Sequence, residues 1–166
     1  VSGMRAALSI ADQGFDVTIV EKEPNLGGKL LGFDSLFPHK QKASEVLEPL
    51  IKRVTTHPRI RVLTESVVKS VYGFIGNFDI GIDAGGKVEN FNVGTIIVAV
   101  GAEVLKPRGL YLYGEDSRVV TQSELEQLIH AGRVDAGRIV MIQCAGSRSV
   151  ERPYCSRICC NEAVKN

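Results

Sequence analysis

The opening of the chain carries the pattern that most constrains its fold. Small and apolar residues recur there at the spacing of one helical face: Met4, Ala7, Leu8 and Ala11. Gly14 then ends the predicted helix, and the apolar run at 17–20 predicts a short buried strand that stops at Glu21. A helix followed directly by a buried strand is the second half of a β–α–β unit, so the sequence predicts an α/β fold.

Gly3 and Glu21 fit two positions of the dinucleotide-binding pattern. That pattern places three glycines between the first strand and the first helix, and an acid about 20 residues later binds the ribose. Gly3 fits the third glycine and Glu21 fits the acid. The first strand and the first two glycines would precede residue 1, so we expect this chain to be an internal piece of a longer protein. The alternative is that Gly3 only packs the helix and Glu21 is a solvated strand end.

The pair Gly27-Gly28 follows the acid and favours the nucleotide interpretation. Flavoproteins with two dinucleotide-binding domains carry a second glycine pair here, which lets the chain pass under the flavin phosphates. The formal net charge of +1 gives no electrostatic reason to expect nucleic acid or an anionic membrane as a partner. No apolar run approaches the length that a membrane span needs, so we expect no direct membrane insertion.

The middle of the chain predicts a helix, a small β-meander and further buried strands. The helix runs from about residue 44 to residue 54, and Pro49 marks its first turn or a kink. Strand-like segments follow at residues 60–71, 77–83, 88–93 and 95–105. Gly85-Gly86 predicts a hairpin turn between the second and third of these. Ser123 is the predicted N-cap of a later helix, and residues 138–144 read as another buried strand that ends at Cys144.

All four cysteines lie near the end of the chain: Cys144, Cys155, Cys159 and Cys160. If residues 155–165 are helical, Cys155 and Cys159 share one face and Cys160 lies about 100° further round. Cys144 then completes a set of four from the end of its strand. An adjacent cysteine pair strains a tetrahedral zinc site, whereas a [4Fe-4S] cluster offers four separate corners. The spacing of the cysteines alone favours a [4Fe-4S] cluster. A zinc site and disulfide bonds remain as alternatives. Arg148, Arg152 and Arg157 could compensate its charge.

The segment IQCAGSRSVERPYCSRICC, together with the opening helix and strand and the FP pair at residues 37–38, resembles the A-subunit family of heterodisulfide reductase. The resemblance covers almost all of the chain. It implies a Rossmann-like FAD-binding domain of the thioredoxin-reductase type and a [4Fe-4S] cluster on the four cysteines. It also implies FAD binding at seven positions: Gly3, Glu21, Lys22, Gly27, Gly28, Val67 and Gly101. The segment after FP often contains cysteines in this family and contains none here.

From this resemblance we expect a partial FAD-binding domain at residues 1–110 and a connecting, cysteine-rich segment at residues 111–166. The implied function is electron transfer between FAD and iron–sulfur clusters in a cytoplasmic oxidoreductase complex with other subunits, and the fragment alone is expected to be inactive. No residue is predicted to act as a catalytic acid or base, since the three histidines are interpreted as surface or turn residues. The alternatives are an NAD(P)H-dependent disulfide oxidoreductase and a zinc-stabilised interaction domain.

Overall fold

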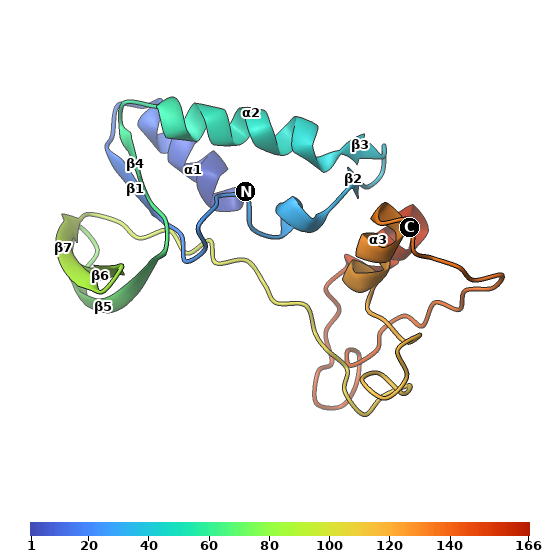
Figure 1. The fold of residues 1–166 in the computed structure, drawn as a ribbon. Helices are drawn as coiled ribbons and strands as arrows, with labels where there is room; N and C mark the ends of the chain where they lie inside the picture. The colour runs from blue at the N-terminus through green and yellow to red at the C-terminus, as the bar shows by residue number, and fades with distance from the viewer. The chain divides into compact units, whose positions relative to one another are not determined.

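The computed structural model describes residues 1–166, which form two compact units (Figure 1). Unit 1 comprises Val1–Leu31 and Glu45–Gly101, and unit 2 comprises Gly32–Ser44 and Ala102–Asn166. Each unit is therefore assembled from two separate stretches of chain. The predicted division at residues 110 and 111 stays a prediction about domains of the whole protein.

Unit 1 begins with the predicted half of a β–α–β unit. Helix α1 spans Ser2–Ala11, and strand β1 spans Val17–Val20. Strand β4, Ile60–Leu63, pairs with β1 in parallel. Helix α2, Ala43–Thr56, connects toward β4 and contains Pro49 in its interior, so the predicted helix at residues 44–54 is confirmed. The α/β architecture predicted from the sequence is present.

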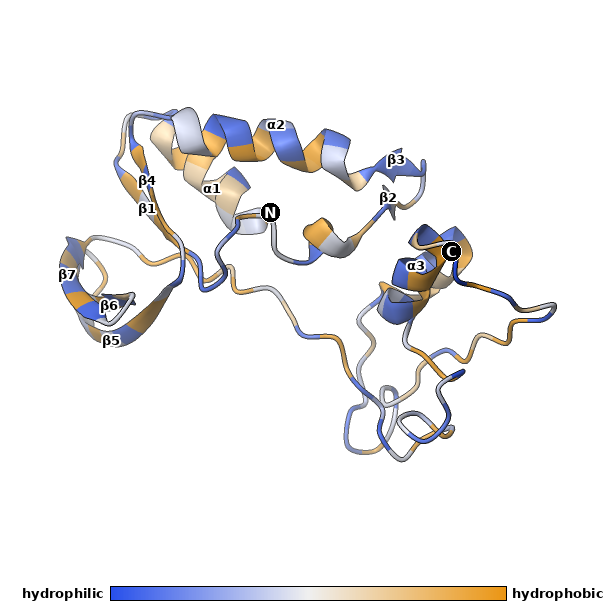
Figure 2. Ribbon diagram, in the orientation of Figure 1, coloured by the Kyte–Doolittle hydropathy of each residue, from blue (hydrophilic) through white to orange (hydrophobic).

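The core of unit 1 forms where α1 and α2 present apolar faces. Its buried side chains are Met4, Leu8, Leu26, Leu47, Leu50 and Val54. In Figure 2 hydrophobic and hydrophilic residues alternate along α2, while β1 and β4 are mainly hydrophobic. This pattern is that of an amphipathic helix next to a partly buried parallel strand pair.

The β-meander is an antiparallel three-stranded sheet in the order β5-β6-β7. The strands span Ser66–Phe74, Asn77–Ala84 and Lys87–Val93. Gly85 and Gly86 join β6 to β7 with φ values of 62° and 88°, the left-handed conformation that such a two-residue turn requires. The predicted hairpin is therefore confirmed. The predicted strand at residues 60–71 is divided between β4 and β5.

The predicted strand at residues 95–105 does not form. This segment has no strand pairing, and Val98 and Val100 are 78% and 90% exposed. An apolar run becomes a buried strand only when a neighbouring strand satisfies its backbone groups. In this structure no strand pairs with it, so the prediction of a strand here is wrong.

Unit 2 contains less regular structure. Short strands β2, Ser35–Leu36, and β3, Gln41–Lys42, form a hairpin. A 3-10 helix at Gly28–Gly32 precedes them and passes from unit 1 into unit 2. Helices α3 and α4 span Gln122–His130 and Cys159–Lys165. The predicted strand at residues 138–144 is absent, because this segment also pairs with no other strand.

Helix α3 begins earlier than the sequence indicated. Thr121, and not Ser123, is its N-cap: the Thr121 hydroxyl accepts a hydrogen bond from the Glu124 N–H at 3.3 Å. The Glu124 carboxylate in turn accepts one from the Thr121 N–H at 2.7 Å. This reciprocal capping box satisfies two backbone donors, and Ser123 lies inside the helix.

A buried ion pair connects α3 to α4. Lys165 Nζ lies 2.5 Å from Glu126 Oε1, and the two side chains are only 4% and 6% exposed. Lys165 also donates to the Ser35 carbonyl and lies over the Phe33 ring. Glu126 accepts from the Asp34 N–H at 3.0 Å. Unit 2 is therefore held together by polar contacts between distant parts of the chain.

Candidate functional site

The carboxyl end of β1 is the first part of the candidate flavin site. The Glu21 N–H donates to the Leu63 carbonyl at 2.8 Å, and the Ser66 N–H donates to the Glu21 carbonyl at 3.0 Å. These bonds bring Glu21 next to Val67, which begins the exposed part of β5. The Glu21 carboxylate accepts a hydrogen bond only from the Glu23 N–H, at 3.1 Å. It therefore remains able to accept further hydrogen bonds from a ligand.

Gly3 lies in the first turn of α1, where no side chain caps the helix. A Cβ atom on Gly3 would lie 3.2 Å from the Ala99 Cβ, a tight contact. The glycine therefore lets the helix approach the 95–100 segment closely, which is the packing role of the third glycine in the dinucleotide pattern. Gly101 follows this segment with φ 73° and open space around its Cα atom.

The two members of the Gly27-Gly28 pair differ in their surroundings. A Cβ atom on Gly27 would lie 2.8 Å from Leu31 Cγ and 2.9 Å from Leu47 Cδ2, so core packing requires this glycine. Gly28 has φ 56° and no atom within 4 Å of a Cβ position. Open space at Gly28 is what a ligand that approaches the backbone needs. Lys22 is exposed and pairs weakly with Glu23.

The residues expected around FAD all lie in unit 1, and the structure joins several of them locally. Glu21 adjoins Val67, and Gly3 contacts the segment that leads to Gly101. A carboxylate that can accept further hydrogen bonds and backbone left open at Gly28 and Gly101 fit the chemistry of a ribose and pyrophosphate ligand. The binding of FAD by these residues stays a prediction.

The cysteine segment in unit 2 is a folded-back loop. The Ser147 N–H donates to the Cys144 carbonyl, and the Arg148 N–H donates to the Tyr154 carbonyl at 3.3 Å. The chain therefore turns back on itself before it reaches Cys155. Cys144 has φ 61°, a left-handed conformation that is rare for a residue with a side chain. Such strain occurs preferentially at functional sites.

Helix α4 does not include Cys155, so the predicted helical face that joins Cys155 to Cys159 is wrong. The helix begins at Cys159. Arg157 has φ 60°, which is incompatible with a right-handed helix and breaks the predicted helix before Cys159. Cys159 and Cys160 are thus consecutive residues of the first helical turn, and Cys155 precedes them in an irregular segment.

Two of the sulfur atoms take part in hydrogen bonds with this irregular segment. The Arg157 N–H donates to Cys155 Sγ at 3.3 Å, and the Ser156 hydroxyl lies 3.2 Å from Cys159 Sγ. Hydrogen bonds to sulfur are among the features that tune iron–sulfur clusters. Sequence reasoning missed them, although a serine between two cysteines is a signal that could have suggested such a contact.

All four cysteines are free thiols: Cys144 is half-buried and the other three are exposed. Nowhere in the structure do three or more Cys, His, Asp or Glu side chains gather as a metal site. The four thiols are the right donors for an iron–sulfur cluster, but their arrangement here does not fit one. The three neighbouring arginines are exposed: Arg148, Arg152 and Arg157.

The histidines do not gather at either site. His39 and His130 are exposed, as expected. His57 is partly buried at the end of α2, where its Nε2 atom lies 3.3 Å from Asp12 Oδ1. None of them adjoins the cysteines in sequence.

None of the helices combines the length and the apolar character that crossing a bilayer would require.

No protein-family model matches the chain. Three curated relatives match it along nearly its whole length, and all three are iron–sulfur A-subunits of CoB–CoM heterodisulfide reductase. The second of two such proteins of Methanopyrus kandleri is 28% identical over 257 residues and covers 99% of this chain. The first protein of the same organism is 30% identical over 263 residues. The protein of Methanocaldococcus jannaschii is 28% identical over 260 residues.

The chain spans 39% of the length of each of these relatives. The match to the M. kandleri relative of 28% identity extends over 257 residues, whereas this chain has 166 residues. That relative therefore contains additional residues within the matched stretch. Among solved structures, L-proline dehydrogenase from P. horikoshii matches 60% of the chain with a TM-score of 0.53 and 20% identity. The chain covers 20% of that structure. This likeness supports the predicted fold. The match along nearly the whole chain carries more weight: the chain is similar to A-subunits of heterodisulfide reductase over 39% of their length.

Proposed function

We propose that this chain is part of an oxidoreductase subunit that transfers electrons between FAD and an iron–sulfur cluster. The observation that carries the proposal is the four-cysteine segment within a chain that matches, along its length, proteins named as iron–sulfur subunits of heterodisulfide reductase. Their names also describe one subunit of several, so we propose that other subunits of an electron-transfer complex are its partners. Bound FAD can accept two electrons together and release them singly.

In this proposal FAD binds to unit 1. The Glu21 carboxylate accepts hydrogen bonds from the ribose, and the open backbone at Gly28 and Gly101 lets the ligand approach closely. Gly3 allows the helix to pack, and Gly27 keeps the turn compact against Leu31 and Leu47. Lys22 and Val67 complete the proposed set. These residues bind and orient the cofactor and perform no proton transfer.

The proposed ligands of a [4Fe-4S] cluster are Cys144, Cys155, Cys159 and Cys160. The support is their number, their free thiols and the hydrogen bonds that two of their sulfur atoms make. The four thiols do not gather in this structure. Binding of the cluster would require the four thiols to come together from the Cys144 loop, the segment before α4 and the first turn of α4.

The decisive experiment measures iron, acid-labile sulfide and flavin in the protein prepared without oxygen. The proposal predicts one flavin and about four iron and four sulfide atoms per chain, the composition of a [4Fe-4S] cluster. Each Cys→Ser variant at the four positions should lose most of the iron while retaining flavin. Val150→Ser is the matched control, because Val150 lies fully exposed in the same loop and its replacement removes no thiol.

The flavin site is tested separately by Glu21→Gln, which should reduce the flavin content while the iron content remains. Glu48→Gln is its control, since Glu48 is exposed on α2 and is not among the proposed flavin-binding residues. Zinc in place of iron would instead support a zinc-stabilised domain. Full flavin content without iron would support a flavin-dependent disulfide oxidoreductase.

A further inference from the structure

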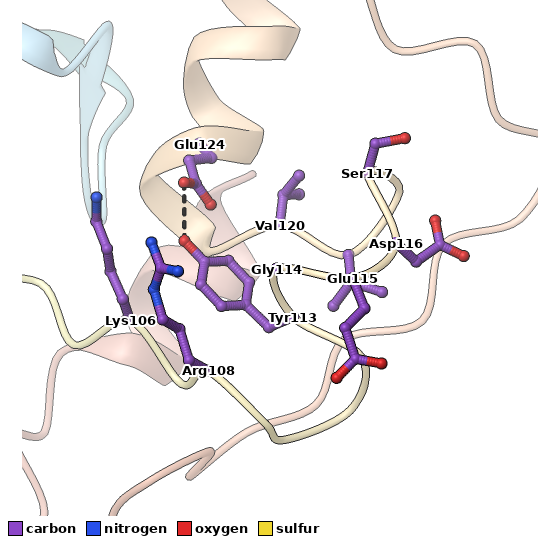
Figure 3. A pocket seen from close by; sticks show the side chains of 10 residues that line it. Lys106, Arg108, Tyr113, Gly114, Glu115, Asp116, Ser117, Val120 and Glu124 are labelled. Atoms are coloured by element: carbon purple, nitrogen blue, oxygen red, sulfur yellow. Dashed lines mark hydrogen bonds between the residues drawn. The ribbon is translucent and has the colours of Figure 1, made fainter.

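Unit 2 contains a cavity that the proposed electron-transfer function does not use (Figure 3). Its volume is about 460 Å³, and it is open to solvent, with Lys106, Arg108 and Glu115 exposed. The side chains that matter for its chemistry are Lys106, Arg108, Tyr113, Glu115, Asp116 and Glu124. All of them lie between Ala102, where the second stretch of unit 2 begins, and the first turn of α3. The cavity therefore belongs to a single unit.

A self-bonded loop forms the walls of this cavity. The Tyr113 N–H donates to the Leu110 carbonyl at 2.9 Å, and the Asp116 N–H donates to the Leu112 carbonyl at 3.0 Å. Tyr111 and Leu112 are consecutive left-handed residues, with φ values of 52° and 65°. This conformation is costly for side chains of their size and persists only where the surrounding loop imposes it. The shape of the cavity is therefore defined by the loop itself.

Two of the three carboxylates around the cavity are already hydrogen-bonded. Glu124 accepts from the Thr121 N–H and hydroxyl and, at 3.0 Å, from the Tyr113 hydroxyl. Burial raises the pKa of Tyr113, and the Glu124 hydrogen bond raises it further, so the hydroxyl stays a donor to that carboxylate. The Arg118 guanidinium binds Asp116 at 2.6 Å.

The two cations of the cavity have no such partners. The carboxylates around the cavity bond to Arg118, Tyr113 and Thr121 and not to Lys106 or Arg108. Figure 3 shows Arg108 beside the Tyr113 hydroxyl, with Lys106 on the other side of Arg108. Among the smaller influences on the two pKa values, the Arg108 charge lowers the pKa of Tyr113 and the Lys106 charge lowers the pKa of Glu124. Glu115 also has no side-chain partner, and Figure 3 shows its carboxylate on the other side of the Tyr113 ring.

We propose that this cavity binds a small phosphate ester. The phosphoryl group would contact Lys106 and Arg108, and hydroxyl or amino donors at the other end of the ligand would contact Glu115. Unpaired cations beside a preformed wall can make charge-assisted hydrogen bonds to phosphate oxygens. The proposal is independent of the flavin and cluster sites and goes beyond the proposed electron-transfer function.

The test measures binding of inorganic phosphate and of AMP to the full chain by isothermal titration calorimetry. Wild-type protein should bind both saturably, more tightly at low ionic strength, with AMP the tighter ligand. The double variant Lys106→Gln/Arg108→Gln should weaken binding of both by about tenfold or more. Glu115→Gln should weaken the binding of AMP and leave the binding of inorganic phosphate unchanged. Arg133→Gln, which changes an exposed arginine of unit 2 outside the cavity, should bind like wild type.

Glu21→Gln separates this site from the proposed flavin site, because AMP binding in the unit 2 cavity should survive that change. Circular dichroism of each variant verifies folding; the substituted cavity side chains are exposed, so the fold should be retained. Absence of saturable binding, or unchanged affinity in the double variant, would overturn the proposal. AMP affinity equal to that of phosphate, with no effect of Glu115→Gln, would overturn the assignment of an ester.

Discussion

In unit 1, ten of the buried hydrophobic residues lie on two helices, a loop and the meander, whereas in unit 2 only Ala43 and Leu125 are buried hydrophobic residues. The buried positions of unit 2 instead include Glu126 and Lys165. Apolar burial is nonspecific, so many sequences with the right periodicity can form unit 1. A buried ion pair requires two particular residues to meet. The candidate flavin site is therefore supported by an apolar core, while helix α4, which carries Cys159 and Cys160, is held by a buried ion pair.

The largest expected effect is the loss of the buried ion pair. Lys165→Met leaves the Glu126 carboxylate buried without its cation, and we expect unit 2 to lose about 3–5 kcal/mol of stability. Hydrogen exchange of the α3 and α4 amides measures this, and the α1 amides should be unaffected. Arg59→Met, which breaks the exposed Arg59–Asp16 pair, should cost less than about 1 kcal/mol.

The double variant Lys165→Met/Glu126→Leu tests whether the unpaired carboxylate causes this loss of stability. It removes both charges and should recover much of the lost stability, because no carboxylate is then left unpaired. If Lys165→Met alone leaves hydrogen exchange of the α3 amides unchanged, the buried ion pair does not stabilise unit 2. The proposed difference between the two units is then wrong.

Truncation of a buried side chain in the apolar core of unit 1 is expected to have the next largest effect on stability. Leu50→Ala removes a side chain that is 3% exposed, and we expect unit 1 to lose about 2–5 kcal/mol. Chemical denaturation followed by exchange of the α1 and α2 amides measures the loss. Ile75→Ala is the control, since Ile75 is 86% exposed and its truncation should change stability by less than about 0.5 kcal/mol.

Loss of the helix cap should have a smaller effect. Thr121→Ala removes the cap of α3 and should cost about 0.5–2 kcal/mol, whereas Ser123→Ala should cost much less because Ser123 caps nothing. Thermal unfolding of the two variants compares them directly. Equal losses would show that Thr121 is not the N-cap.

The capping box also makes α3 sensitive to acid. Burial alone would raise the pKa of Glu124, but hydrogen bonds from Thr121 and Tyr113 and the charge of Lys106 outweigh it and lower the pKa below 4.5. Because the folded pKa is depressed, this contribution to stability is fully present above pH 4.5 and is lost as the pH falls through the folded value. Thermal unfolding between about pH 7 and about pH 3 measures it, and Glu124→Gln should flatten the dependence.

The smallest effect is expected at the exposed Asp116–Arg118 pair. The Arg118 guanidinium donates to Asp116 and lowers the pKa of that carboxyl from 3.8 to about 2. Arg118→Ala should return the pKa toward 3.8, as NMR titration of the Asp116 carboxyl would show. Overall stability at neutral pH should hardly change, since an exposed pair is strongly screened.

Several elements could be predicted from the sequence because their signals are local. The helical periodicity of residues 4–11, the apolar strand before Glu21 and the Gly85-Gly86 turn each gave the correct element. The strands predicted at residues 95–105 and 138–144 did not form, because a strand depends on a pairing partner as well as on its own apolar residues. The helix predicted from Cys155 failed because Arg157 adopts a left-handed conformation that no local pattern revealed.

The sequence by itself determined the α/β order, the hairpin turn, the relationship to the A-subunit family of heterodisulfide reductase and the identity of four candidate metal-binding thiols. These follow from residue type and spacing, which need no knowledge of distant contacts. Only the tertiary structure decided that Gly27 packs against Leu31 and Leu47, that Lys165 meets Glu126 and that the thiols stay apart. Such outcomes depend on side chains brought together from remote positions, and the free energy of those contacts is absent from any local pattern.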